Sequence, residues 1–235
     1  MKSLVLTALA LGCAIDVSAQ EAPAEQEHED EIAVTGEAAL VSDYRWRGVS
    51  LTDNDPAIQA DIYASHSSGV YVGVWASAPT RQSSDSEIGL SLGYTFSLWD
   101  GDFDVAIVNY VYPGLDDTDY ATFASVYERQ VGDWTARVHF EYAPAQKHLG
   151  DESAYAALEV ERPIGETGFA FMGGLGWEKG VFTLDGEKWD YLIGGRYRFE
   201  SVALDLTYVG TDEDAPPGGR SIYGGGPVLA VKTEF

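Results

Sequence analysis

The sequence predicts an all-β protein, and specifically a transmembrane antiparallel up-and-down β-barrel of about 12 strands. Three observations support this fold class. Apolar residues recur at every second position, the segments between the expected strands alternate between short and long, and aromatic residues stand near strand ends on the apolar face. A bilayer admits strands only as a closed barrel, because an open sheet edge leaves backbone groups unpaired in hydrocarbon.

Residues 1–19 have the three-part pattern of a secretory signal peptide. Lys2 precedes an apolar run from Leu4 to Ile15, and Ala19 stands just before Gln20. A helix needs roughly twenty apolar residues to cross a bilayer, so this run is too short to act as an anchor. We expect cleavage near Ala19 and export of the remainder; lipoprotein processing at Cys13 is the alternative.

Residues 20–34 form an acidic segment without periodicity. Such a composition predicts a disordered periplasmic leader. The alternative is that this leader folds back and plugs a barrel built from residues 35–235.

Charge and cysteine content exclude several kinds of partner. The net charge is −24, and it stays so after cleavage because Lys2 and Asp16 are both lost. This negative field repels phosphate backbones, so nucleic acid is not expected as a partner. Cys13 lies in the signal peptide, so the exported chain has no cysteine for Cys-ligated zinc sites. No cofactor is predicted.

The clearest strand has Ile88, Leu90 and Leu92 on one face, with Glu87 and Gly89 among the residues on the other. Only a strand separates two such sets by alternation. Strands are predicted at 37–47, 56–65, 70–78, 86–96, 103–112, 119–128, 134–142, 154–162, 169–177, 189–199, 202–209 and 228–235.

The connections favour a membrane barrel over a soluble sandwich. The segments 66–69, 97–102, 129–133, 163–168 and 200–201 are short, and they alternate with the longer segments 48–55, 79–85, 143–153, 178–188 and 210–227. Segment 113–118 is a long-side loop of modest length. Bacterial outer-membrane barrels have short periplasmic turns and longer external loops. An even number of strands places both termini on the short-turn side.

Aromatic residues at the strand ends predict two interfacial girdles. The periplasmic girdle would contain Phe96, Trp134, Phe169, Phe199 and Phe235, and the external girdle Trp46, Tyr142, Trp177, Trp189 and Tyr208. The simpler explanation is that aromatic residues favour strands in general.

The last predicted strand alternates up to a C-terminal phenylalanine, Phe235. This ending resembles the signal by which the barrel-assembly machinery recognises outer-membrane proteins. We therefore expect that machinery as a partner. Outer-membrane lipid is expected around the barrel, and divalent ions could bridge the acidic external loops to lipopolysaccharide.

The segment from Val41 to Ser50, VSDYRWRGVS, followed by DPAIQA at 55–60, resembles the N-terminal signature of the TorF family, a proteobacterial outer-membrane family. VYVGVWAS at 70–77 and YVYPG at 110–114 continue the resemblance, which covers the chain from about residue 35 to its end. The resemblance implies a β-barrel with a porin-like role, and it supplies no catalytic residues.

The polar phase of the predicted strands is expected to face the lumen, because charges are costly in hydrocarbon. The predicted pore-lining residues are Asp43, Arg45, Arg47, Glu87, Arg137, His139, Glu141, Glu159, Glu161, Asp190, Arg196, Arg198 and Lys232. One hypothesis is a cationic wall of Arg45, Arg47, Arg196 and Arg198 that faces Asp43, Glu141, Glu159 and Glu161 across a constriction. The alternative is a solid network of salt bridges that fills the barrel.

Signals for chemistry are weak. No G-x-S-x-G motif is present, and His139 is the one histidine on a clearly predicted strand. Acidic clusters in the expected external loops lack EF-hand spacing, so no metal site is predicted.

The sequence therefore favours a non-enzymatic outer-membrane channel for passive diffusion of small hydrophilic solutes. The alternatives are a closed structural or partner-binding barrel, and a lipid-modifying outer-membrane enzyme.

Overall fold

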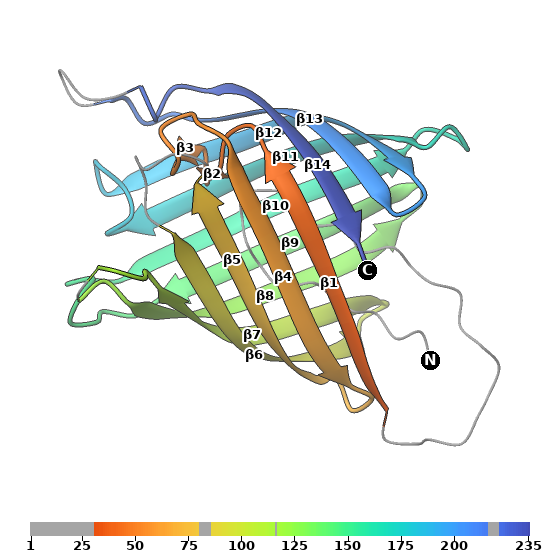
Figure 1. Ribbon diagram of the computed structural model, residues 1–235, viewed down its shortest axis with the longest axis horizontal. Coiled ribbons are helices and arrows are strands. Elements are labelled where there is room, and N and C mark those ends of the chain that lie inside the picture. The colour runs from red at the N-terminus through yellow and green to blue at the C-terminus, as the bar shows by residue number, and fades with distance from the viewer. Residues whose placement is uncertain (1–30, 80–85, 116, 216–220) are drawn as a thin grey trace.

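The computed structural model describes residues 31–79, 86–115, 117–215 and 221–235. These residues form a closed antiparallel barrel in which consecutive strands are neighbours and the first strand pairs with the last (Figure 1). The barrel strands are β1 (Ile32–Val41), β4 (Ala57–His66), β5 (Val70–Pro79), β6 (Glu87–Leu98), β7 (Gly101–Val111), β8 (Tyr120–Val131), β9 (Trp134–Ala143), β10 (Ser153–Pro163), β11 (Phe169–Gly180), β12 (Glu187–Phe199), β13 (Val202–Thr211) and β14 (Gly226–Glu234). The predicted all-β barrel of 12 strands is confirmed.

The described residues contain no helix long and apolar enough to cross a membrane.

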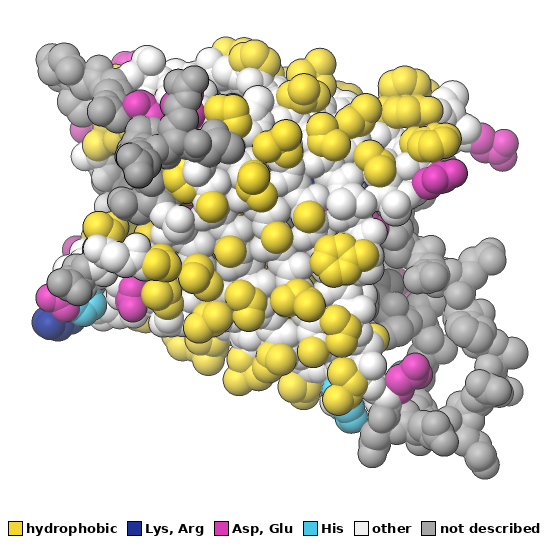
Figure 2. Space-filling model, in the orientation of Figure 1, with side chains coloured by type: hydrophobic (Ala, Val, Ile, Leu, Met, Phe, Trp, Pro, Cys, Tyr) yellow, Lys and Arg dark blue, Asp and Glu magenta, His cyan; other side chains and the backbone are white. Residues whose placement is uncertain are grey.

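The two phases of each strand separate as the alternation predicts. In β6, Leu90 and Leu92 are 45% and 56% exposed on the outside, whereas Glu87 is buried inside. Exposed hydrophobic side chains occur on the outer face of the barrel strands, and Figure 2 shows them on the side toward the viewer. This arrangement inverts that of a soluble protein, because the apolar phase points away from the interior and leaves the polar phase to line the lumen.

The two ends of the barrel differ in their connections. Tight turns join β4 to β5, β6 to β7, β8 to β9, β10 to β11 and β12 to β13, and we call this the short-turn end. The opposite, long-loop end carries the longer segments, among them 42–56 and 144–152. The predicted alternation of short and long connections is confirmed.

The predicted strand 37–47 is wrong in its second half. β1 begins at Ile32 and ends at Val41, so residues 32–34, predicted to belong to the leader, are part of the barrel; residues 1–30 lie outside the described part. After Val41 the chain leaves the wall and forms a small hairpin from β2 (Arg45–Trp46) and β3 (Val49–Ser50). We call residues 45–50 the lumen hairpin.

The turn of the lumen hairpin requires the left-handed backbone region. Arg47 has a φ of 49° and Gly48 a φ of 86°. A Cβ on Gly48 would lie 2.5 Å from the carbonyl oxygen of Gly210 in β13. Glycine is therefore needed here both for the backbone conformation and for the close approach to the wall.

Candidate functional site: a charged lumen crossed by a hairpin

The lumen hairpin lies at the long-loop end and reaches the far wall of the barrel (Figure 1). The Arg47 guanidinium donates to Glu141 on β9 at 2.6 Å and to Glu178 on β11. Lys188 on β12 donates to the backbone carbonyl of Arg47 at 3.1 Å. The hairpin leaves the wall between β1 and β4, so these contacts connect opposite sides of the barrel.

Aromatic rings surround the Arg47 side chain. Its guanidinium carbon lies 4.2 Å from the ring centroid of Trp46 and 4.1 Å from that of Tyr155. Trp46 also makes an edge contact with Phe182, from the loop between β11 and β12, at 5.2 Å between centroids. The prediction that Trp46 belongs to the external girdle is therefore wrong, because this ring packs inside the barrel.

A second set of bonds holds the base of the hairpin. Arg45 forms an ion pair with Asp43 at 2.6 Å and donates to the Gly224 carbonyl, also at 2.6 Å. Ser50 donates to Asp43 through its hydroxyl and to the Ile222 carbonyl through its backbone N–H. The hairpin is thus fixed to its own loop and to the segment that precedes β14.

The charge state of the hairpin follows from these contacts. Burial by itself would lower the pKa of Arg47, but the carboxylates of Glu141 and Glu178 outweigh this effect and raise the pKa. Arg47 therefore stays positively charged. Burial, followed by the Glu87 carboxylate, raises the pKa of Tyr44 well above its ordinary value, so Tyr44 remains a hydrogen-bond donor to Glu87 at 3.1 Å.

Closer to the short-turn end, charged side chains of alternating sign follow the inner wall. Their ion pairs are Glu128–Arg137 at 2.6 Å, Arg137–Glu161 at 3.8 Å, Glu161–Arg196 at 3.3 Å, Arg196–Asp205 at 2.6 Å and Asp205–Lys232 at 3.3 Å. We call these six residues the charge belt. Its pairs join neighbouring strands, except that Glu161 on β10 and Arg196 on β12 are two strands apart. The belt therefore runs along the wall from β8 to β14.

The predicted cationic wall facing a separate acidic wall is not the arrangement observed. Arg45 pairs with Asp43, its neighbour in the same loop, and Arg196 pairs with Glu161 on its own side of the barrel. Glu159 lies 3.3 Å from His139 on the adjacent strand. Among the predicted arginine–acid contacts, the Arg47–Glu141 pair does connect opposite sides.

The wall from β4 to β7 has a different character. Its inward positions include Asp61, Glu87 and Asp104 with several tyrosines, and these four strands contain no lysine or arginine. Tyr71 donates to Asp104 at 2.7 Å, while the second carboxylate oxygen of Asp104 has no hydrogen-bond partner. The lumen thus has one half with acidic groups and tyrosines and another half with paired charges of both signs.

Two tyrosines of this acidic half lie flat against the wall. A Cβ on Gly73 would come within 2.0 Å of the Tyr63 ring, and a Cβ on Gly93 within 2.3 Å of the Tyr71 ring. Each tyrosine is paired in register with the glycine that it covers. Glycine therefore lets these rings line the barrel instead of projecting across it.

Three residues of the hairpin contact were not among the predicted pore-lining residues. Glu178, Lys188 and Tyr155 all touch Arg47, but the first two fell in a predicted loop because β11 and β12 extend further than expected. Gly176 and Glu178 both face inward, and this alternation could have extended the predicted strand 169–177 to include Glu178.

The other predicted girdle residues lie on the outward phase of their strands, and the other predicted pore-lining residues lie on the inward phase. No group of three or more His, Cys, Asp or Glu side chains in the described parts of the chain is arranged to hold a metal ion.

These features define a closed β-barrel with an apolar exterior and a charged lumen crossed by a hairpin. Residues 25–226 match the model of the Gcw_chp family, described as bacterial proteins of unknown function, and the chain belongs to that family. No match is found among curated proteins.

The solved structures that are similar to this chain have low sequence identity to it. A chain from a study of the in-meso crystallization of membrane proteins has a TM-score of 0.56 and 10% identity, with 86% of this chain and 83% of that chain covered. OmpF of Salmonella typhi, in complex with daunomycin, gives a TM-score of 0.48 and 8% identity, with coverages of 88% and 98%. The outer-membrane protein OpdK of Pseudomonas aeruginosa gives 0.45 and 10%, with coverages of 77% and 57%.

Proposed function

We propose that this protein is an outer-membrane channel for passive diffusion of small hydrophilic solutes, and that the lumen hairpin forms its constriction. The observation that carries the proposal is the direction of the ion pairs. Pairs of the charge belt run along the wall between nearby strands, so these side chains line a path instead of bridging it. The cross-lumen contacts of Arg47 come from a loop that folds inward at one end.

The exterior of the barrel supports a membrane location. Leucine, valine, isoleucine and aromatic side chains cover the outer face, and this surface fits hydrocarbon. The resemblance to the TorF family favours the outer membrane. Backbone pairing of Phe235 with Gly36 at 3.0 Å brings the C-terminus to the closing seam of the barrel.

We propose that the channel prefers cations. Strands β4 to β7 place Asp61, Glu87 and Asp104 on the inner wall without any lysine or arginine. On the opposite side the arginines and lysines are paired with carboxylates, which reduces their field in the lumen. A passing solute therefore meets a net negative wall.

A second candidate is a closed barrel with a structural or partner-binding role. It is favoured by the burial of the inner charges, since Lys188 and Arg196 are each 1% exposed and Glu178 is fully buried. A lipid-modifying enzyme is disfavoured by the position of His139, which points into the lumen beside Glu159 and away from the outer face.

Single-channel recording in a planar bilayer tests the proposal. The refolded protein should give discrete conductance steps, with a reversal potential in a salt gradient that reports cation preference. A folded barrel that remains silent in the bilayer would contradict channel function and favour the closed barrel. Steps with anion preference would leave the channel in place and overturn the proposed selectivity.

A further inference from the structure

An arginine faces outward at the short-turn end. Arg162, near the end of β10, lies on the phase opposite to inward Glu161 and pairs in register with Phe171 on β11. Its side chain is half exposed. Because arginine is costly on a lipid-facing surface except near the interfaces, its depth in a bilayer is expected to be that of the headgroups.

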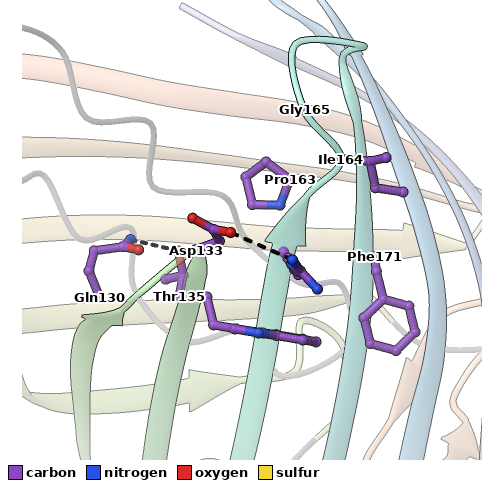
Figure 3. Close-up of a pocket in the computed structure, with 9 residues that line it drawn as sticks. Gln130, Asp133, Thr135, Pro163, Ile164, Gly165 and Phe171 are labelled. Atoms are coloured by element: carbon purple, nitrogen blue, oxygen red, sulfur yellow. Dashed lines mark hydrogen bonds and ion pairs between the residues drawn. The ribbon is translucent and has the colours of Figure 1, made fainter.

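Arg162 borders an open pocket between two short turns, one joining β8 to β9 and the other joining β10 to β11 (Figure 3). The pocket has a volume of about 920 Å³, and Trp134, Ile164 and Phe171 line it on the apolar side. The Arg162 guanidinium carbon lies 5.4 Å from the Trp134 ring, and Trp134 meets Phe171 edge-on at 6.0 Å. The pocket therefore joins a cation, an interfacial indole and an apolar surface.

The partner of Arg162 is weakly held. Asp133 lies 3.5 Å from the guanidinium, and its side chain is 81% exposed (Figure 3). Exposed ion pairs of this kind contribute little free energy. A ligand phosphate that accepts two hydrogen bonds from the guanidinium can replace this contact.

We propose that this pocket binds the phosphate-bearing headgroup of a membrane phospholipid, with its acyl chain on Ile164 and Phe171. Arg162 supplies the charge, Trp134 orients the guanidinium, and Asp133 competes with the lipid phosphate. The proposal requires that the barrel lies in a bilayer, but it does not require that the barrel conducts.

Native mass spectrometry of the refolded protein in detergent, titrated with phosphatidylglycerol, tests the site. The variant Arg162→Gln should bind the lipid about tenfold more weakly, because it loses charge-assisted hydrogen bonds. Arg129→Gln is the matched control. Arg129 also faces outward at the short-turn end and pairs with Asp100 at 3.5 Å, but it does not line the pocket. This control should bind as the unchanged protein does.

A second variant and a second lipid complete the experiment. Asp133→Asn removes the competing carboxylate and should strengthen binding, which a variant that merely damages folding cannot do. Diacylglycerol, which lacks the phosphate, should bind equally weakly to the unchanged protein and to Arg162→Gln.

An equal loss of lipid affinity in Arg162→Gln and Arg129→Gln would mean that the lipid is attracted generally to the positive charges at the short-turn end. That result would overturn the proposal. Displacement of the lipid by inorganic phosphate at equal concentration would identify a phosphate site without lipid specificity. That result would also reject the proposal.

Discussion

Replacing Arg47 with alanine should open the constriction. The guanidinium holds the lumen hairpin to Glu141 and Glu178, and the three side chains are at most 5% exposed. Removing one partner of a buried ion pair costs about 3–5 kcal/mol, because the remaining charges lose their compensation. Lys188, at 3.4 Å from Glu178, still neutralises part of the remaining charge, so the lower end of this range applies.

The lost free energy destabilises the attached position of the hairpin and not the barrel, because the contacts of Arg47 hold a loop and not a strand pair. With about 1.4 kcal/mol for each factor of ten, a loss of about 3 kcal/mol raises the population of detached hairpin roughly a hundredfold. Detachment also leaves Glu141 and Glu178 without their guanidinium. We therefore expect larger conductance steps, more frequent transitions and a stronger preference for cations.

Single-channel recording of Arg47→Ala in a salt gradient measures all three quantities. Arg129→Ala is the control, since it removes an exposed arginine at the short-turn end and should leave conductance and reversal potential unchanged. If Arg47→Ala and the unchanged protein had the same conductance and selectivity, the hairpin would not be the constriction and the reasoning would be refuted.

Three other changes test separate parts of the structure. Gly48→Ala puts a Cβ 2.5 Å from the Gly210 carbonyl at a φ of 86°, so we expect a loss of about 1–3 kcal/mol in hairpin stability and faster proteolysis of this loop. Asp104→Asn should shift the reversal potential toward anions, because it removes a carboxylate from strands β4 to β7, which contain no lysine or arginine. An unchanged potential would exclude Asp104 from the path. Phe235 pairs with Gly36 at the barrel seam, and its deletion should lower the amount of assembled barrel in the outer membrane. The assembled fraction is measured as the protein that resists unfolding in detergent at room temperature. Normal assembly of the deletion variant would contradict a role of Phe235 as the recognition signal.

Strand positions could be predicted from sequence because alternation and turn residues are local. The predicted strand 134–142 differs from β9 by one residue, and most other strands differ by one to three residues at their ends. The exception is 37–47, where Asp43, Arg45 and Arg47 alternate with Tyr44 and Trp46 as they would in a wall strand. A two-residue hairpin preserves this period, so alternation cannot tell a wall strand from an inward loop.

The pairing of charges could not be predicted in the same way. Arg196 contacts Asp205 because β12 and β13 are paired in a register that places them side by side, and the sequence sets that register only through the turn at 200–201. One feature was nevertheless visible in the sequence, because Arg81 is the only basic residue other than histidine between Arg47 and Arg129. That gap corresponds to the acidic half of the lumen.

The lumen hairpin connects the size of the proposed path to its charge. Arg47 compensates Glu141 and Glu178 on the far wall, while the acidic groups of β4 to β7 have no lysine or arginine on their own strands. Release of the hairpin would therefore widen the lumen and take the Arg47 guanidinium away from Glu141 and Glu178 in one step. Any condition that detaches the hairpin should change conductance and cation preference together. The charge belt lies nearer the short-turn end. A change in the charge belt should therefore alter selectivity without the same increase in conductance. A measured increase in conductance without a shift in reversal potential would separate the two properties and contradict this coupling.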